Sequence, residues 1–351
     1  MDNKYRMLDN KIIWHPDCLE KWRKNQFFFP IHLDIGATSS CNYKCVHCFY
    51  QYLSHKKRNI PETLLLSLME DIAEAGVRSI FFASQGEPLL NPATPDAIVL
   101  AAQKGVDVAL SSNASLLDET IACKILPHLT WLRISVLARS KETYCKLHGT
   151  SENIWGKVFK NLSNLKKIVN EYNSKTTIGI QTCLLPGNKD DILPLITDLK
   201  TMGIDYITLR PISNHPENAY KVSDNLLEEY RSILEEAEKI SDINFQVIVR
   251  WNLENETKSY TKCLGLPFIA FVNADGGVYT CGCHLDEQAY CYGNIHEQKF
   301  SDIWKSEYRI NLMQQSVLNP NFSKCDILCR HHSINKFLWY YEKEPDHVNF
   351  I

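Results

Sequence analysis

Cys41-Asn-Tyr-Lys-Cys45-Val-His-Cys48 places three thiols within eight residues of one short loop. A cubane iron–sulfur cluster takes four cysteine ligands, one on each iron. Three closely spaced cysteines therefore suit a [4Fe–4S] cluster with one iron left open for a small-molecule ligand. The alternative is a structural zinc site, which needs a fourth nearby ligand such as His47 or His55.

The composition excludes several classes of protein. A length of 351 residues suits one large domain with a smaller one attached, and 44% apolar and 23% charged residues are typical of a globular protein. The net charge of −3 gives no electrostatic basis for nucleic acid as the main partner. No apolar run is long enough to span a bilayer, and residues 1–22 lack the apolar core of a signal peptide. We therefore expect a cytoplasmic protein that binds neither nucleic acid nor membranes.

Short β-rich runs alternate with amphipathic helical patterns from residue 31 to about residue 210. We expect six strands, at 31–40, 78–84, 106–112, 131–136, 177–184 and 206–210. Several of the helices between them end in a glycine that leads into the next strand, as at Gly76, Gly105 and Gly203. Six βα units in series predict an α/β fold with a parallel sheet. Because a closed barrel needs eight units, we expect a partial (β/α)6 TIM-like barrel.

Polar residues follow the expected strands at the end where such folds place their chemistry. The second strand runs into Gln85-Gly86-Glu87-Pro88. Together with the cysteine loop, this segment resembles the radical S-adenosylmethionine superfamily over residues 31–211. The resemblance implies that S-adenosylmethionine binds the open iron and that Gly86, Glu87 and Pro88 hold its methionine ammonium, although Gln85 replaces the family's first glycine. An ammonium group needs an acidic residue and exposed backbone acceptors.

The same resemblance implies further residues around the cofactor. His47 would lie near the adenine, where the family usually has an aromatic residue. Ser111 and Asn113 share strand parity and could reach the ribose, and Ser135 is a second candidate on the fourth strand. Each of the last three could instead be a capping residue at a strand end.

A second group of cysteines lies toward the C-terminus. Four of them flank or follow a predicted hairpin: Cys263, Cys281, Cys325 and Cys329. This arrangement resembles the twitch domain, a shortened form of the SPASM module. The resemblance implies one auxiliary [4Fe–4S] cluster on these four thiols, with Cys283 and Cys291 as substitutes because the spacing of the last pair is unusual. A zinc ribbon is the alternative, since tetrahedral zinc uses similar hairpins.

These observations divide the chain into three parts. We expect an N-terminal extension at residues 1–30, a barrel at residues 31–250 and a small α+β iron–sulfur domain at residues 251–351.

The resemblance implies an enzyme in which a 5′-deoxyadenosyl radical abstracts hydrogen from a C–H bond, with an electron donor of the flavodoxin or ferredoxin type as partner. The substrate radical is then either oxidised through the auxiliary cluster or quenched by a hydrogen atom, which gives an epimer. Cys183 shares parity with Gln181 on the fifth strand and is the candidate hydrogen donor if both face the barrel interior. It could instead be a small residue that fills the barrel.

The sequence narrows the substrate only to a class. Gln181, Arg210 and His215 offer a cation and hydrogen-bonding groups for an anionic or hydroxyl-rich ligand. Nothing before residue 31 is long enough for a leader-peptide-binding domain, which favours a small polar metabolite such as a sugar, an aminocyclitol or a nucleotide-linked sugar. Two alternatives remain: a radical enzyme that modifies a ribosomal peptide or protein, and a non-enzymatic cysteine-rich metal-binding protein.

Overall fold

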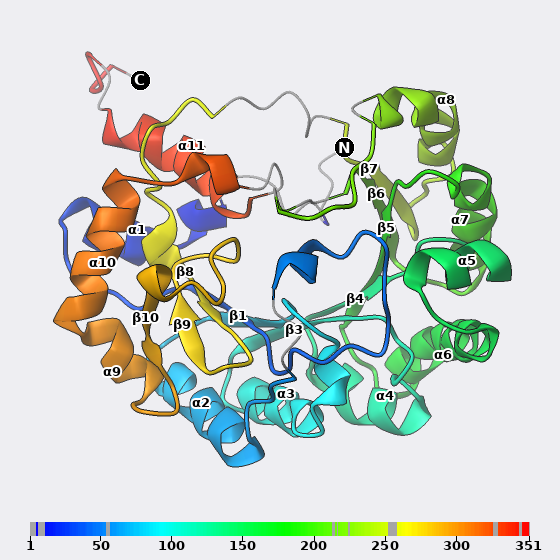
Figure 1. Ribbon diagram of the computed structural model, residues 1–351, viewed down its shortest axis with the longest axis horizontal. Helices are drawn as coiled ribbons and strands as arrows, with labels where there is room; N and C mark the ends of the chain where they lie inside the picture. The colour runs from blue at the N-terminus through cyan, green and yellow to red at the C-terminus, as the bar shows by residue number, and fades with distance from the viewer. Residues whose placement is uncertain are drawn as a thin grey trace.

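A computed structural model describes Tyr5 and residues 11–53, 57–212, 215, 217–223, 225–251, 258–325, 329–343 and 346–350 (Figure 1). Ten strands of these residues form one sheet in the order β10-β9-β8-β1-β2-β3-β4-β5-β6-β7. The strands are β1 (His32–Ile35), β2 (Ser79–Phe82), β3 (Asp107–Ser112), β4 (Trp131–Ser135), β5 (Thr177–Cys183), β6 (Tyr206–Arg210), β7 (Gln246–Val249), β8 (Ile269–Val272), β9 (Gly277–Tyr279) and β10 (Cys291–Asn294).

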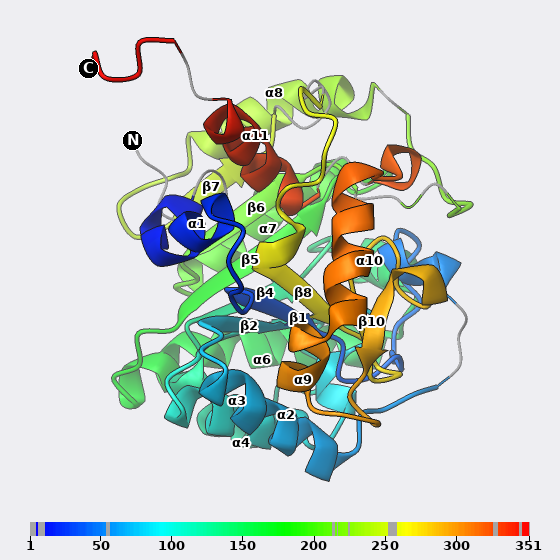
Figure 2. The same ribbon diagram turned by 90° about the vertical axis from the view of Figure 1, so that its left-hand side faces the viewer.

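The described part of the chain contains eleven α-helices. They are α1 (Pro16–Arg23), α2 (Glu62–Glu74), α3 (Thr94–Gln103), α4 (Glu119–Ile125), α5 (Lys141–His148), α6 (Glu152–Glu171), α7 (Ile192–Thr201), α8 (Leu226–Glu238), α9 (Phe300–Lys305), α10 (Glu307–Leu318) and α11 (His331–Glu342). Figure 1 shows α2, α3, α4, α6 and α7 in an arc around the curved strands. Figure 2 shows α1 and α11, from opposite ends of the chain, side by side, and Leu19 and Leu338 join them in one apolar cluster. No described helix is long and apolar enough to cross a membrane.

Strands β1 to β7 are parallel, and their two faces differ in polarity. On β4, Leu132 and Ile134 are fully buried beneath the helices, whereas Arg133 and Ser135 alternate with them and stay partly accessible. Because side chains on a strand alternate between faces, the helices cover an apolar outer face and the barrel interior is polar. The interior is therefore the place to look for chemistry.

The predicted partial barrel is confirmed, and two features extend it. A seventh parallel strand, β7, pairs with β6. The predicted hairpin forms β8 and β9, and β8 pairs in parallel with β1, with Leu33 beside Ala270. The C-terminal hairpin thus continues the barrel sheet past its first strand, and the two edges, β7 and β10, leave the barrel open.

Candidate active site

The cysteine loop follows β1 and packs against the end of α5. The backbone N–H of Lys44 donates to the carbonyl of His148 (3.1 Å), and that of Val46 donates to the carbonyl of Leu147 (3.0 Å). Gly149 ends α5 with φ +59°, and a Cβ atom on it would lie 2.3 Å from the carbonyl oxygen of Lys44. Only glycine permits this approach, so the end of α5 fixes the position of the loop.

The three thiols of the loop form one electrostatically linked group. Burial raises the pKa of Cys41 to about 11. Burial and the neighbouring Cys48 and Cys41 raise the pKa of Cys45 well above its usual value, and burial raises that of Cys48. Such thiols lose their protons when a metal replaces them, so this donor set suits a metal centre whose assembly releases protons.

His148 donates a hydrogen bond to one of these thiols. Its Nε2 accepts from the backbone N–H of Leu137 (3.1 Å), and its Nδ1 lies 3.4 Å from Sγ of Cys45. Burial and the nearby His47 lower the pKa of His148 far below its usual value, so the ring is neutral. Because Nε2 accepts, the proton is on Nδ1 and points to sulfur. Sequence analysis missed this residue, since a histidine before a glycine gives no signal of such a contact.

Gly86, Glu87 and Pro88 form a turn that lies on the backbone leading into the cysteine loop. Gly86 has φ +82°, and a Cβ atom there would lie 2.3 Å from the carbonyl oxygen of Thr38 and 2.6 Å from that of Ser40. The N–H of Glu87 donates to the same Ser40 carbonyl (2.8 Å), and Pro88 is buried. The turn after β2 is therefore fixed beside the three thiols by an approach that a larger residue would block.

The carboxylate of Glu87 is buried and accepts hydrogen bonds on both oxygens. Oε1 accepts from Oγ of Ser112 (2.7 Å), and Oε2 accepts from the backbone N–H of Asn113 (2.7 Å). Burial, opposed by these bonds, raises the pKa of Glu87 to about 7. A buried carboxylate that ionises near neutrality can receive a ligand cation such as an ammonium group. Sequence analysis missed Ser112, because the alternation of side chains along the strand pointed to its neighbours Ser111 and Asn113.

Asn113 and Ser111, the predicted ribose residues, have different surroundings. Nδ2 of Asn113 donates to Oδ1 of Asn42 in the cysteine loop (2.9 Å), and Nδ2 of Asn42 donates to Oγ of Ser115 (2.8 Å). Oγ of Ser111 instead accepts from Nε of Arg133 (3.3 Å). Asn113 thus belongs to the Glu87 side of the site, and Ser111 belongs to the barrel interior.

His47 and Ser135 complete the predicted cofactor residues. Nδ1 of His47 is buried and has no hydrogen-bond partner in the described part of the chain. Burial and the nearby Arg210 lower the pKa of His47 to about 4, so its ring is neutral. A buried polar atom without a protein partner is one that a ligand could satisfy. Ser135 lies on the inward face of β4, in register with Gln181 of β5.

Cys183 lies between the barrel interior and the cysteine loop. It is in register with Arg210 of β6, and its pKa is raised by burial and lowered in part by Arg210 and Arg133. It packs in an apolar cluster that includes Val46, so it lies beside the cysteine loop. Its side chain is 5% exposed and packs in a small apolar cluster with Leu185. The structure therefore brings Gln181, Cys183 and Arg210 to one end of the barrel.

His215 contacts the segment directly after the third thiol. Its ring stacks on Tyr52 with the centroids 3.6 Å apart and meets the edge of Phe49 at 5.8 Å. Nδ2 of Asn218, on the same loop, donates to the carbonyls of Cys48 (3.2 Å) and Phe49 (2.9 Å). The loop after β6 is thereby attached to the cysteine loop. The flanking Asn214 and Pro216 lie outside the described residues.

Five C-terminal cysteines form a second group: Cys263, Cys281, Cys283, Cys325 and Cys329. Cys281 and Cys283 share a side-chain hydrogen bond that, with burial, raises the pKa of Cys281. Burial and the three neighbours Cys263, Cys325 and Cys283 raise that of Cys329. Nδ2 of Asn335 on α11 donates to Sγ of Cys263 (3.4 Å), which fixes that thiol. This group contains more thiols than the four that a cubane takes.

Cys291 lies apart from this group. Its Sγ donates to the carbonyl of Gly293 (3.3 Å), and its pKa is raised by burial and by Asp275 rather than by another thiol. Of the two substitute ligands, the structure therefore brings Cys283 to the other thiols and leaves Cys291 on β10.

Both thiol groups fit iron–sulfur clusters. Among the described residues, no three His, Cys, Asp or Glu side chains are arranged to hold a single metal ion. A cubane spreads its ligands over separate irons, so its thiols lie farther apart than those around one ion. The first group would hold a cluster with an open iron beside Glu87, and the second would hold a fully ligated cluster. His55, an alternative zinc ligand, lies outside the described residues.

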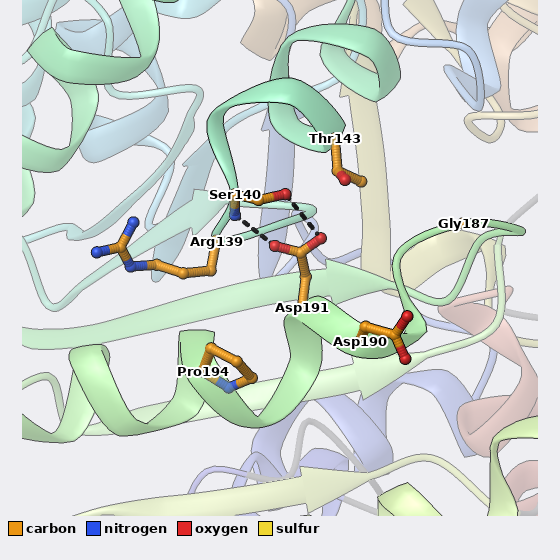
Figure 3. Close-up of a pocket in the computed structure, with 7 residues that line it drawn as sticks. All are labelled: Arg139, Ser140, Thr143, Gly187, Asp190, Asp191 and Pro194. Atoms are coloured by element: carbon orange, nitrogen blue, oxygen red, sulfur yellow. Dashed lines mark hydrogen bonds between the residues drawn. The ribbon is translucent and has the colours of Figure 1, made fainter.

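A separate pocket of about 470 Å³ lies on the rim between α5 and α7 (Figure 3). Its central carboxylate, Asp191, accepts from Oγ of Ser140 (3.0 Å), and Arg139 pairs with Asp198. Asp191 and Arg139 thus have protein partners, and no thiol is among the residues that line the pocket. Its contacts stabilise the loops after β4 and β5.

Comparisons with known proteins agree with this geometry. Residues 35–199 match the Radical SAM superfamily, and residues 263–330 match the SPASM iron–sulfur cluster-binding domain. The tungsten-containing aldehyde ferredoxin oxidoreductase cofactor-modifying protein of Pyrococcus furiosus is 21% identical over 318 residues, which cover 84% of this chain and 87% of that protein. An S-adenosylmethionine-dependent nucleotide dehydratase of Lacinutrix mariniflava is 29% identical over 214 residues, 58% of this chain and 43% of that protein.

The fold has a solved counterpart. Streptococcus suis SuiB bound to S-adenosylmethionine superposes with a TM-score of 0.66 at 15% identity, covering 96% of this chain and 81% of that one. The matches over residues 35–199 and 263–330 identify the chain as a radical S-adenosylmethionine (radical SAM) enzyme, with a [4Fe–4S] cluster that binds S-adenosylmethionine and a C-terminal domain for an auxiliary iron–sulfur cluster.

Proposed function

We propose that this radical SAM enzyme abstracts hydrogen from a C–H bond of a small polar metabolite, such as a sugar, an aminocyclitol or a nucleotide-linked sugar. The observation that supports this proposal is the polar, partly accessible inner face of β3 to β6. Its polar inward residues include Ser111, Arg133, Ser135, Gln181 and Arg210. Such a surface can hydrogen-bond hydroxyl and anionic groups, and it adjoins the cysteine loop through Cys183, which packs with Val46.

The residues around the first cluster have separate roles in this proposal. Cys41, Cys45 and Cys48 would hold the cluster, which together with S-adenosylmethionine supplies the 5′-deoxyadenosyl radical. The buried carboxylate of Glu87 would orient the methionine ammonium, and the neutral ring of His47 would face the adenine. An electron donor of the flavodoxin or ferredoxin type would reduce the first cluster in the cytoplasm.

The fate of the substrate radical divides the proposal into oxidation and epimerisation. In epimerisation the Cys183 thiol gives its hydrogen atom to the substrate radical, and the resulting thiyl radical needs an electron and a proton to be restored. In oxidation the substrate radical loses an electron to the auxiliary cluster and a proton to a base, which gives a ketone. Residues 31–250 would serve as the barrel and residues 251–351 as the auxiliary domain.

Mass spectrometry in deuterated buffer separates these outcomes. The reduced enzyme is incubated with S-adenosylmethionine and candidate sugars, aminocyclitols or nucleotide-linked sugars. A product heavier by one deuterium indicates epimerisation, because the Cys183 thiol exchanges with solvent. A product lighter by two hydrogens indicates oxidation. If no candidate of these classes changes while S-adenosylmethionine is cleaved, the proposal is wrong.

Modification of a ribosomal peptide is the second candidate. It is supported by the fold shared with SuiB, one structure of which holds the precursor peptide SuiA. A genomic neighbour that encodes a short precursor peptide, modified by the enzyme in the same assay, would favour this candidate over a metabolite. The non-enzymatic interpretation is wrong, because the chain is a radical SAM enzyme.

A further inference from the structure

The positive charge of the arginines in the barrel interior is only partly neutralised by the carboxylate of Asp34. Oδ1 of Asp34 on β1 accepts from Arg330, and it also contacts Nε2 of His32 at 3.2 Å. Burial alone would raise the pKa of Asp34, but the charge of Arg330 and the bond to His32 outweigh it, so the pKa is lowered. Asp34 is thus ionised and neutralises Arg330.

Arg133 and Arg210 have no such partner. Neither forms an ion pair with a carboxylate in the described part of the chain, and their hydrogen bonds go to neutral oxygens. Nε of Arg133 donates to Oγ of Ser111 (3.3 Å), and Nε of Arg210 donates to the carbonyl of Pro211 (3.2 Å). Both guanidinium groups therefore keep their terminal N–H donors available on the partly accessible inner face of the barrel.

The guanidinium of Arg133 is held in place by aromatic rings. Its Cζ lies 4.9 Å from the ring centroid of Phe81 and 5.7 Å from that of Trp131. Cζ of Arg330 lies 4.8 Å from the same Phe81 ring, so one aromatic side chain supports both cations. Stacking and the single bond to Ser111 orient the planar group without neutralising it.

This arrangement is unfavourable without a ligand. Burial, together with the charges of Arg330 and Arg210, lowers the pKa of Arg133 to about 10, so it stays a cation at neutral pH. A partly desolvated charge without a counter-ion costs free energy, and a bound anion removes that cost. The planar donor fork of arginine matches the oxygens of phosphate and carboxylate groups.

We infer that Arg133 and Arg210 form a binding site inside the barrel for an anionic group of the substrate, a phosphate or a carboxylate. This inference rests on the proposed function and narrows it to anionic metabolites, such as nucleotide-linked or phosphorylated sugars, and away from aminocyclitols, which carry no anionic group. Cys183 is in register with Arg210, and Arg133 is in register with Gly179 on the same strand, β5. Cys183 also packs with Val46 of the cysteine loop. An anion bound there would hold the attached carbon skeleton next to the thiol and the cysteine loop.

Thermal unfolding of the anaerobically purified enzyme with both clusters tests the site. The unfolding temperature is measured against increasing inorganic phosphate, and separately against acetate, with chloride keeping the ionic strength constant. A ligand that binds only the folded state raises this temperature in a concentration-dependent way. We expect phosphate, acetate or both to stabilise the native enzyme, and Arg133→Gln to weaken the apparent affinity at least about tenfold.

Arg231 supplies the matched control. It also stacks on an aromatic ring, with Cζ 5.3 Å from the centroid of Trp251, but it is exposed on α8 and pairs with Glu228 at 2.7 Å. Arg231→Gln should therefore respond to both anions as the native enzyme does. If Arg133→Gln fails to fold, Arg133→Lys keeps the charge without the planar fork and should still weaken anion binding.

The inference is overturned if neither anion stabilises the native enzyme, or if the native enzyme and the Arg133 variants are stabilised equally. Turnover of a neutral sugar without any anion effect would also overturn it and would leave the proposed function standing. Anion binding that depends on Arg133, with no turnover of any metabolite class, would contradict the proposed function and support the site.

Discussion

Glu87 is the residue whose charge state should control cofactor binding. Its pKa of about 7 means that the carboxylate becomes protonated as the pH falls below neutrality. Because an ammonium group binds the ionised form, the affinity for S-adenosylmethionine should decrease as the pH is lowered from about 8 to about 6. Glu87→Gln should weaken binding about tenfold or more and remove this pH dependence, since a charge-assisted hydrogen bond contributes roughly 1.5–3 kcal/mol.

Equilibrium binding of S-adenosylmethionine at several pH values checks this prediction, with iron content measured in parallel. The control is Glu119→Gln, which changes an exposed carboxylate in the first turn of α4. Affinity within twofold of the native value, or an unchanged pH slope, would mean that Gly86, Glu87 and Pro88 form only a turn.

Cys183 is the residue that should determine whether the enzyme epimerises or oxidises its substrate. If it donates hydrogen, Cys183→Ala should still consume S-adenosylmethionine, but the yield of epimer should collapse. Exchange of the substrate hydrogen with 5′-deoxyadenosine should then appear, because the substrate radical has no donor. Product analysis by mass spectrometry checks this. Full activity of the variant, with a loss of two hydrogens from the product, would remove epimerisation and leave oxidation.

At the scale of elements, the strands and the turn after β2 could be predicted because their signals are local. Alternation of apolar and polar residues predicts strands, and Gly86 has a backbone conformation that only glycine adopts easily. Alternation along the strand did not identify Ser112 as a partner of Glu87. At the end of β3, the hydroxyl of Ser112 and the backbone N–H of Asn113 both donate to the Glu87 carboxylate, although they are consecutive residues. The contact of His148 with Cys45 depends on how α5 packs, and no local pattern reports it.

The cysteines of the C-terminal segment allow a prediction about which thiols bind the auxiliary cluster. Cys263→Ala and Cys329→Ala remove thiols of the converging group and should each lower the iron content by up to about half, because a cubane needs all four ligands. Cys291→Ala, on β10, should keep native iron, since its thiol bonds to Gly293 instead. Iron and sulfide analysis with electron paramagnetic resonance checks the set. Loss of the auxiliary signal in Cys291→Ala alone would refute this ligand assignment.

For the whole molecule, the sequence could predict the partial barrel, but it could not predict that the C-terminal hairpin extends the barrel sheet. The parallel pairing of β8 with β1 joins residues more than two hundred positions apart, and Arg330 reaches Asp34 over a similar separation. Such contacts arise from the packed sheet, so local sequence patterns could predict neither the pairing of the hairpin with the barrel nor the charge balance of the barrel interior. The sequence could not identify Arg133 as part of a binding site, because its lack of a carboxylate partner among the described residues emerges only from the assembled barrel.

We propose that the cysteine loop holds the cluster at which S-adenosylmethionine is cleaved, and that the C-terminal cysteines hold a second cluster. The native enzyme should contain about eight irons, four for each cubane. The most direct test replaces Cys41, Cys45 and Cys48 together with alanine and measures iron content and 5′-deoxyadenosine formation under reducing conditions. We predict about half the native iron and no 5′-deoxyadenosine. Continued formation of 5′-deoxyadenosine by this variant would contradict the account.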